Sequence, residues 1–341
     1  IGAEEYGKYS IRFSFFMAIS SFAIHWLNAA TLRYYSKYKN NKLLPKIFLF
    51  SVSGSIIFGL LVLSVFNGHD FLESTDQLTS AIGFFLLISL CIFQFLSALF
   101  RAQLKPNYVI IITILQSIMG LAIPIIFLKI FGQSYKYLLL GLAISYSLPP
   151  IIYFFRYIYQ LKIVFKKSKD IGEYKFVLIS FLKYGSPLSL WFAMSMLLPF
   201  FDRFFIEYYF AYKITGIYAG FSDILVRVFS ITLFPITMAV HPRIMFAWNN
   251  NNQTVAISLW RKAIQYQLGI IIILMAIVAI FRDIFFHLIM ITIPEINITY
   301  SSLLMPLLAG SFLWQFALLC HKALEMDQRT ILMAVLMFIA V

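Results

Sequence analysis

The sequence predicts an all-α polytopic membrane protein, and two observations lead to this fold class. Hydrophobic residues make up 61% of the 341 residues and charged residues only 12%, about half the charged fraction of a soluble domain. Apolar runs of about 20 residues recur from end to end, and each is long enough to cross a hydrocarbon core of roughly 30 Å as a helix. The runs lack the two-residue alternation of a membrane barrel, so we expect helical spans.

Apolar segments follow a polar and acidic start at residues 1–8. We expect them at about 9–32, 44–66, 80–100, 106–128, 136–160, 176–201, 214–240, 263–281, 299–320 and 330–341. The last segment is too short to cross a bilayer. The chain also opens on Ile1 rather than methionine. We therefore expect one span to be missing before the first segment and the last span to be incomplete.

The positive residues alternate between connections, and this alternation predicts the orientation. Of the 27 lysine and arginine residues, 19 fall in every second connection and six in the others. Cytoplasmic loops carry the excess of positive charge. Residues 1–8 are therefore expected outside, and the basic connection at 156–183 in the cytoplasm. This topology accounts for the formal charge of +13, so no nucleic-acid partner is expected.

The long basic connection suggests two lobes. We expect an N-terminal lobe at 1–160, a cytoplasmic linker at 161–175 and a C-terminal lobe at 176–341. A shift of 209 residues places Gly7-Lys8-Tyr9-Ser10 on Gly216-Ile217-Tyr218-Ala219, and both steps open an outside-to-inside span. An even number of spans separates them, so the lobes would be parallel repeats of six helices each. About five spans of each lobe would lie in this chain.

The residues give little support for catalysis. The sequence holds no paired carboxylates with acid–base spacing, no histidine–cysteine cluster and no Walker-type phosphate loop. Cys91 and Cys320 both lie in apolar spans. We therefore expect a protein that is not an enzyme and that binds no metal or cofactor.

Ionisable residues within spans are the main candidates for function, because they are costly in hydrocarbon unless they face protein or water. Arg12 lies one turn into the first span, and Asp223 and Arg227 lie in its repeat partner. Asp223 and Arg227 are four residues apart, so they share a helix face and can pair. This pair either only lowers the cost of insertion or belongs to a cationic cavity between the lobes. Arginine in such a cavity suits a diphosphate, because it makes two-pronged contacts with phosphate oxygens.

Several neutral or boundary residues are secondary candidates. His25 lies deep in the first span with Asn28 one turn on, and Gln94 and Gln116 lie at mid-span depth, as does Gln315. Such groups either bind sugar hydroxyls or hold helices together. Asp202 and Arg203 end one span, and they fit an outer-rim ion pair, with gating as the alternative.

Four stretches resemble one transporter family, in the order in which they occur. They are IGAEEYGKYS (1–10), KYGSPLSL (183–190), DRFFI (202–206) with KITGIYAG (213–220), and HKALEMDQRT (321–330). They are similar to segments of Wzx-type polysaccharide flippases in the multidrug/oligosaccharidyl-lipid/polysaccharide exporter superfamily. The resemblance implies two MATE-like six-helix lobes in the bacterial cytoplasmic (inner) membrane. It also implies movement of an undecaprenyl-pyrophosphate-linked oligosaccharide, such as an O-antigen unit, to the outer leaflet by alternating access.

The same resemblance implies roles and partners. Arg12 and Arg227 would bind the diphosphate, and Asp223 would be their partner or a coupling group. Membrane lipids, a proton or sodium ion for coupling, and other polysaccharide assembly proteins are the partners that it suggests.

Two other classes compete with this interpretation. A cation-coupled multidrug antiporter of the same superfamily should have a cavity dominated by carboxylates, whereas the spans here hold two arginines and one aspartate. A membrane polysaccharide polymerase or glycosyltransferase needs a sizeable outward loop for its chemistry. The expected outward connections at 67–79 and 282–298 are too short for that.

Overall fold

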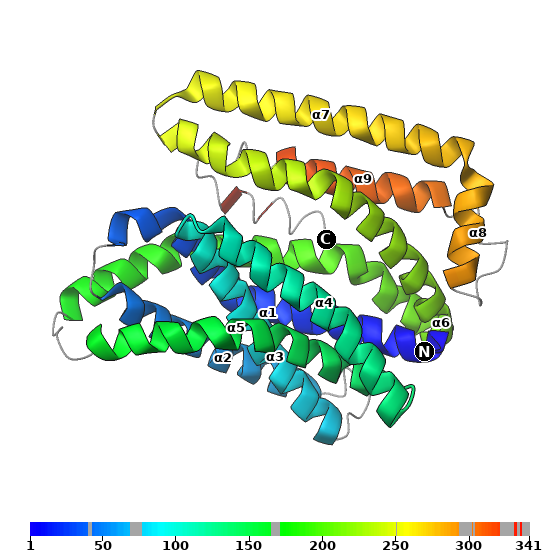
Figure 1. Ribbon diagram of the computed structural model, residues 1–341, viewed down its shortest axis with the longest axis horizontal. Coiled ribbons are helices and arrows are strands. Elements are labelled where there is room, and N and C mark those ends of the chain that lie inside the picture. Colours follow the sequence, from blue (N-terminus) through cyan, green and yellow to red (C-terminus); the bar gives the residue numbers. More distant parts are fainter. Residues whose placement is uncertain are drawn as a thin grey trace. The chain divides into compact units, whose positions relative to one another are not determined.

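The computed structural model describes residues 1–39, 43–68, 77–164, 171–249, 251–292, 302, 304–320, 331–332 and 335. Within these ranges the chain is almost entirely helical and holds no strand (Figure 1). By length and composition, seven of the described helical stretches can cross a membrane. The predicted class, an all-α polytopic membrane protein, is confirmed.

The chain divides into two compact units. Unit 1 is formed by Ile1–Phe205 and Ala334–Val341, and unit 2 by Ile206–Met333. The sequence predicts a boundary between two repeated lobes at residues 160–176, which is a different kind of division from these compact units. The boundary between the repeats stays a prediction.

Unit 1 contains five helices and the first part of a sixth. The helices are α1 (Ala3–Tyr38), α2 (Leu44–Gly68), α3 (Gln77–Ala102), α4 (Pro106–Phe131), α5 (Tyr135–Val164) and the start of α6 (Ile171–Asn249). The remainder of α6 lies in unit 2 with α7 (Gln253–Ile280), α8 (Arg282–Thr292) and α9 (Leu304–Cys320). The predicted segment at 330–341 lies mostly outside the described residues.

One expected connection is much shorter than predicted. The sequence predicts a short aromatic and charged link between the spans at 176–201 and 214–240. Instead, α6 is helical through this stretch and departs from helical geometry only at Ala211, with φ 65° and ψ 171°. These angles lie far from helical values, so the helix breaks sharply at Ala211. A positive φ is also unfavourable for a residue with a Cβ.

Helix α1 is the centre of unit 1. Its residues Ile24, Leu27 and Ala30 are completely buried, and α3, α2 and α5 all pack against it. Helices α1 and α3 pack closely at Gly83 of α3. A Cβ added to this glycine would lie only 2.7 Å from the ring of Phe16 on α1. A helix whose residues are mostly buried is typical of the interior of a membrane bundle.

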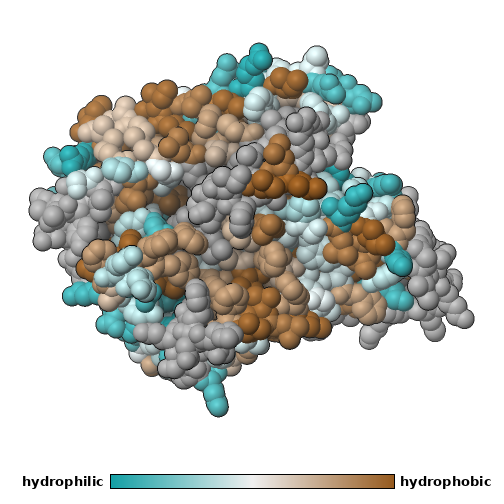
Figure 2. Space-filling view, turned by 180° about the vertical axis from the view of Figure 1, so that it is seen from behind, coloured by the Kyte–Doolittle hydropathy of each residue, from teal (hydrophilic) through white to brown (hydrophobic). Residues whose placement is uncertain are grey.

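Helix α4 has the opposite character. Ile114, Ile118 and Leu121 of α4 are 53%, 61% and 68% exposed. Other hydrophobic side chains, coloured brown, are exposed on the face of the molecule that Figure 2 shows. In water such a surface would be a liability. In a bilayer it is the face that contacts lipid.

Unit 2 is held together by aromatic and polar contacts between helices. Ile244, Ala247 and Ala256 form a small buried cluster with Trp248 and Trp260 packed on it. The indole nitrogen of Trp260 on α7 donates to the carbonyl oxygen of Leu319 on α9, at 3.1 Å. These contacts fix α7 against the end of α6 and against α9 (Figure 1).

Candidate functional site

Arg12 is buried inside unit 1 and lies against an aromatic ring. Arg12 is 5% exposed, and its guanidinium carbon lies 4.3 Å from the centre of the Tyr135 ring. A cation over an aromatic face gains about 2 kcal/mol when both groups are desolvated. The prediction that Arg12 avoids lipid by facing protein is therefore consistent with its surroundings.

Tyr135 is positioned by groups from two other helices. It is the first residue of α5, so its backbone N–H has no partner within the helix. That N–H donates to Oε2 of Glu5 at 2.8 Å, and a carboxylate at a helix N-terminus also interacts favourably with the helix dipole. The hydroxyl of Tyr135 lies 3.5 Å from Oγ1 of Thr79 on α3. Arg12 therefore contacts a ring that α1 and α3 hold in place.

A second guanidinium is buried beside the same stretch of α1. Arg203, on the first part of α6, is 2% exposed, and its Nη1 donates to Oγ of Ser10. Ser10 and Arg12 are two residues apart, so they point to different neighbours, α6 and α5. The outer-rim pairing of Asp202 with Arg203 stays a prediction, and the structure adds that Arg203 reaches α1.

His25 and Asn28 lie further along α1. The imidazole of His25 stacks on the ring of Phe192 in α6, with centroids 3.7 Å apart and planes 3° apart. Asn28 is 4% exposed and its Oδ1 accepts no hydrogen bond from any described residue. Ser10, His25 and Asn28 recur at helical spacing on one face of α1, so this polar face runs along the first part of α6. Binding of a substrate by His25 and Asn28 stays a prediction.

Gln94 and Gln116 have different surroundings. Nε2 of Gln94 on α3 donates to Oγ of Ser20 on α1 at 3.1 Å, which is the arrangement expected of a group that holds helices together. Gln116 is half-buried on α4, the helix with the lipid-exposed face, and its Nε2 would lie 3.2 Å from a Cβ added to Gly120. The sugar-binding alternative stays a prediction for both.

Replacing Gln94 with leucine should destabilise the protein, because it breaks the bond to Ser20 and leaves that hydroxyl buried. Hydrogen bonds between membrane helices are worth about 0.6 kcal/mol on average and up to about 1.7 kcal/mol. We expect the melting temperature in detergent to fall by a few degrees. Gln116→Leu is the matched control and should melt like the unmodified protein; equal melting of the two variants would exclude a packing role for Gln94.

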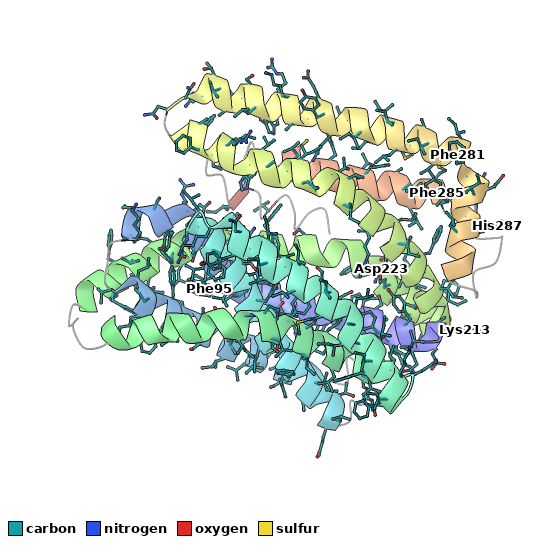
Figure 3. All side chains as sticks on the ribbon, in the orientation of Figure 1. Phe95, Lys213, Asp223, Phe281, Phe285 and His287 are labelled. Carbon is teal, nitrogen blue, oxygen red and sulfur yellow. The ribbon has the colours of Figure 1, made fainter. Side chains whose placement is uncertain are left out.

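Asp223 and Arg227 lie in unit 2, on the second part of α6. Asp223 is half-buried and Arg227 is exposed, and both belong to the same helix. Figure 3 labels Asp223 on this helix together with Lys213, and His287 on α8. The cavity that the sequence predicts would combine Arg12 of unit 1 with Arg227 of unit 2, and it stays a prediction.

Three residues that matter in unit 1 were not among the sequence candidates: Glu5, Ser10 and Tyr135. One signal points towards them. The predicted topology places residues 1–8, the start of the 136–160 span and the end of the 176–201 span on the same outer side. The topology predicts that these residues lie at a similar depth in the membrane, but it does not predict that they contact one another.

These features define a multi-pass helical membrane protein whose central helix carries a buried arginine and a polar face, with a second buried arginine on the neighbouring α6. The described residues contain no cluster of histidine, cysteine and acidic side chains that could hold a metal ion. Residues 1–248 match the family model described as polysaccharide biosynthesis protein, and the chain belongs to this family. The match covers α1 to α5 and nearly all of α6, including every site residue that the sequence predicts from Arg12 to Arg227. A comparison with curated proteins finds no match.

Proposed function

We propose that this protein moves a lipid-linked oligosaccharide of the undecaprenyl-pyrophosphate type across the bacterial cytoplasmic membrane, from the cytoplasmic to the outer leaflet. Membership of the polysaccharide biosynthesis family supports a role in membrane transport for that pathway. The substrate and the direction are our inference. They agree with the predicted orientation and with the resemblance of the chain to Wzx-type flippases.

The observation that carries the proposal is the burial of Arg12 in a membrane-length helix. A charged side chain at such a depth is costly, and in transporters it usually faces a substrate or ion pathway. The guanidinium of arginine is a permanent charge in proteins. An anionic diphosphate is the ligand class that a permanent guanidinium charge favours.

The polar face of α1 supports the proposal that the protein also binds the sugar units of the substrate. Asn28 is buried, and its Oδ1 has no hydrogen bond within the described residues, so it can accept one from a hydroxyl. His25 presents a flat ring that already stacks with Phe192. Sugar units offer both hydroxyls and apolar faces. In this proposal Arg12 and Arg227 bind diphosphate, and His25, Asn28, Gln94 and Gln116 face the sugars during alternating access.

The test is the replacement of Arg227 with alanine. Arg227 is exposed, so its removal should change transport without disturbing the packing of the protein. A charge-assisted hydrogen bond is worth about 1.5–3 kcal/mol, so transport should fall about 10- to 100-fold. Lipid-linked repeat units should accumulate on the inner leaflet while the amount of protein in the membrane is unchanged. Arg243→Ala is the control, since Arg243 is also exposed on α6 but lies beyond the predicted span. Normal surface polysaccharide in Arg227→Ala cells would remove Arg227 from the site.

One observation favours a second candidate, a cation-coupled antiporter of the same superfamily. The carboxylate of Asp223 is half-buried within a predicted span, where a negative charge favours the binding of a coupling cation. In that case Asp223→Asn would abolish drug export, and lipid-linked oligosaccharide would not accumulate.

A further inference from the structure

A groove of about 410 Å³ lies within unit 1, between α1, α2 and the first part of α6. Its walls are aromatic, with Phe22 from α1, Phe50 and Phe58 from α2, and Tyr174 from α6, and no charged side chain lines it. Phe50 and Phe58 are 52% and 44% exposed, so the groove opens on the surface of the unit. All three helices have membrane-spanning length. The open side therefore faces lipid.

The groove also contains buried hydroxyl groups. Ser51 on α2 and Ser189 on α6 both line it and are 6% and 3% exposed. Neither Oγ atom makes a hydrogen bond to any described residue. By contrast, Oγ of Ser55 accepts a hydrogen bond from the indole nitrogen of Trp26 at 3.0 Å. A buried polar group without a partner costs about 1–3 kcal/mol, so an occupant that supplies an acceptor would be stabilised.

Gly54 leaves the middle of the groove open. It lies between the two serines of α2 in the lining, and a Cβ added there would meet no atom within 4 Å. The other helix contacts of unit 1 are much closer, as at Gly83, where an added Cβ would collide with Phe16. The open space is thus local to the groove and is wide enough for a chain to lie against α2.

Positive charge stands at the end of the groove that is predicted to face the cytoplasm. Lys46 precedes Ser51 by five residues on α2, which is a rise of about 7.5 Å. Lys175 follows the groove residue Tyr174 at the start of α6. The interfacial region of a leaflet is about 5–7 Å deep. With phosphate at the level of the lysines, Ser51 lies at the level of the ester groups of a phospholipid.

We propose that the groove binds a diacyl glycerophospholipid of the cytoplasmic leaflet. Its phosphate lies near Lys46 and Lys175, an ester carbonyl accepts a hydrogen bond from Ser51, and one acyl chain passes Gly54 towards Phe58. A polyprenyl chain has no acceptor at the depth of Ser51, so the ester lipid fits better than the lipid-linked substrate. The proposal is independent of which molecule the protein transports.

The test measures lipid retained by the full chain in nanodiscs, using dioleoylphosphatidylglycerol and its dialkyl ether analogue as probes. The two lipids share a headgroup and differ in the ester carbonyl. Protein is re-extracted and the bound lipid is quantified by mass spectrometry. A hydroxyl–carbonyl hydrogen bond is worth about 1 kcal/mol, so the unmodified protein should retain the ester lipid about fivefold better than the ether lipid.

Variants locate the site. Ser51→Ala should retain both lipids equally, whereas Ser189→Ala, a matched buried serine deeper in the groove, should keep the ester preference. Gly54→Leu fills the open space and should lower retention of both lipids about tenfold. Gly310→Leu is its control, because a Cβ on Gly310 of α9 also meets no atom within 4 Å.

Three results would overturn the proposal: equal retention of ester and ether lipids by the unmodified protein, an ester preference that survives Ser51→Ala, or retention of added undecaprenyl diphosphate in place of the phospholipid. If Gly54→Leu does not accumulate in the membrane, the comparison of Ser51→Ala with Ser189→Ala decides the question by itself. Loss of transport in Arg227→Ala with normal phospholipid retention would keep the two proposals separate.

Discussion

Replacing Gly185 with leucine is expected to prevent the assembly of unit 1. Gly185 is buried on the first part of α6, and a Cβ added there would lie 2.6 Å from the carbonyl carbon of Trp26 and 2.8 Å from its Cα. The obstacle is the backbone of α1, so no side-chain rotation can relieve it. Overpacking ordinarily costs about 1–3 kcal/mol. A full leucine against backbone should cost at least the upper end of that range.

The collision would spread beyond Gly185, because α1 and the first part of α6 are in contact at several places. Tyr34 stacks on Phe181 with centroids 5.8 Å apart, and His25 stacks on Phe192 further along. Separating the helices at Gly185 would break both contacts. Small residues allow this kind of close approach between membrane helices.

The measurement is the yield and melting temperature of the detergent-solubilised protein, followed by fluorescence-detected size exclusion. Gly185→Leu should give little monodisperse protein, and Gly185→Ala, which carries the same colliding Cβ, should also lose yield and melt at a clearly lower temperature. Gly269→Leu on α7 is the control, because a Cβ at Gly269 meets no atom within 4 Å. A Gly185→Leu protein with unchanged yield and melting temperature would show that α1 and α6 do not approach in this way.

The sequence predicts the helices well and their ends poorly, for a physical reason. An apolar run marks the part of a helix that lies in hydrocarbon, so the run at 44–66 matches α2 (Leu44–Gly68) closely. The run at 9–32 underestimates α1 (Ala3–Tyr38), because the helix continues with polar residues into the interface. Polarity reports depth in the membrane rather than where a helix ends.

The stretch after Asp202 illustrates the same limit. Its aromatic and charged residues indicate an interface and were therefore expected to form a connection. The residues Tyr208, Tyr209 and Phe210 are strongly exposed, as expected at an interface, yet they are helical up to the break at Ala211. The location of this stretch at an interface stays a prediction, whereas the predicted connection is replaced by helix up to the break at Ala211.

The candidate site could be predicted only in part. Arg12 stands out in a sequence because a charge inside an apolar run is rare. Its neighbour Tyr135 does not stand out, since tyrosines are common near membrane interfaces. Ser10 and Arg203 are 193 positions apart, and nothing local in either segment specifies that they meet. Contacts of this kind depend on how helices pack, which one sequence does not reveal.

Replacing Arg12 with alanine is the substitution that we expect to affect transport most. It removes a buried positive charge from unit 1, near the start of α1, and takes away the cation that contacts Tyr135. If the proposed function holds, the diphosphate loses a charge-assisted partner worth about 1.5–3 kcal/mol. We expect translocation of lipid-linked repeat units to fall about 10- to 100-fold, measured as their accumulation on the inner leaflet.

Two companion variants separate binding from packing at this position. Arg12→Lys keeps the charge and loses the planar fork, so it should restore part of the transport if the charge attracts an anion. Tyr135→Leu removes the ring and keeps Arg12, so it should lower the melting temperature about as much as Arg12→Ala does and preserve more of the transport. Equal loss of transport in Arg12→Ala and Tyr135→Leu would mean that Arg12 acts only by holding α5 against α1. The charge itself is the discriminating property, because packing needs only a group that fills the space over the ring, whereas a diphosphate needs a positive charge.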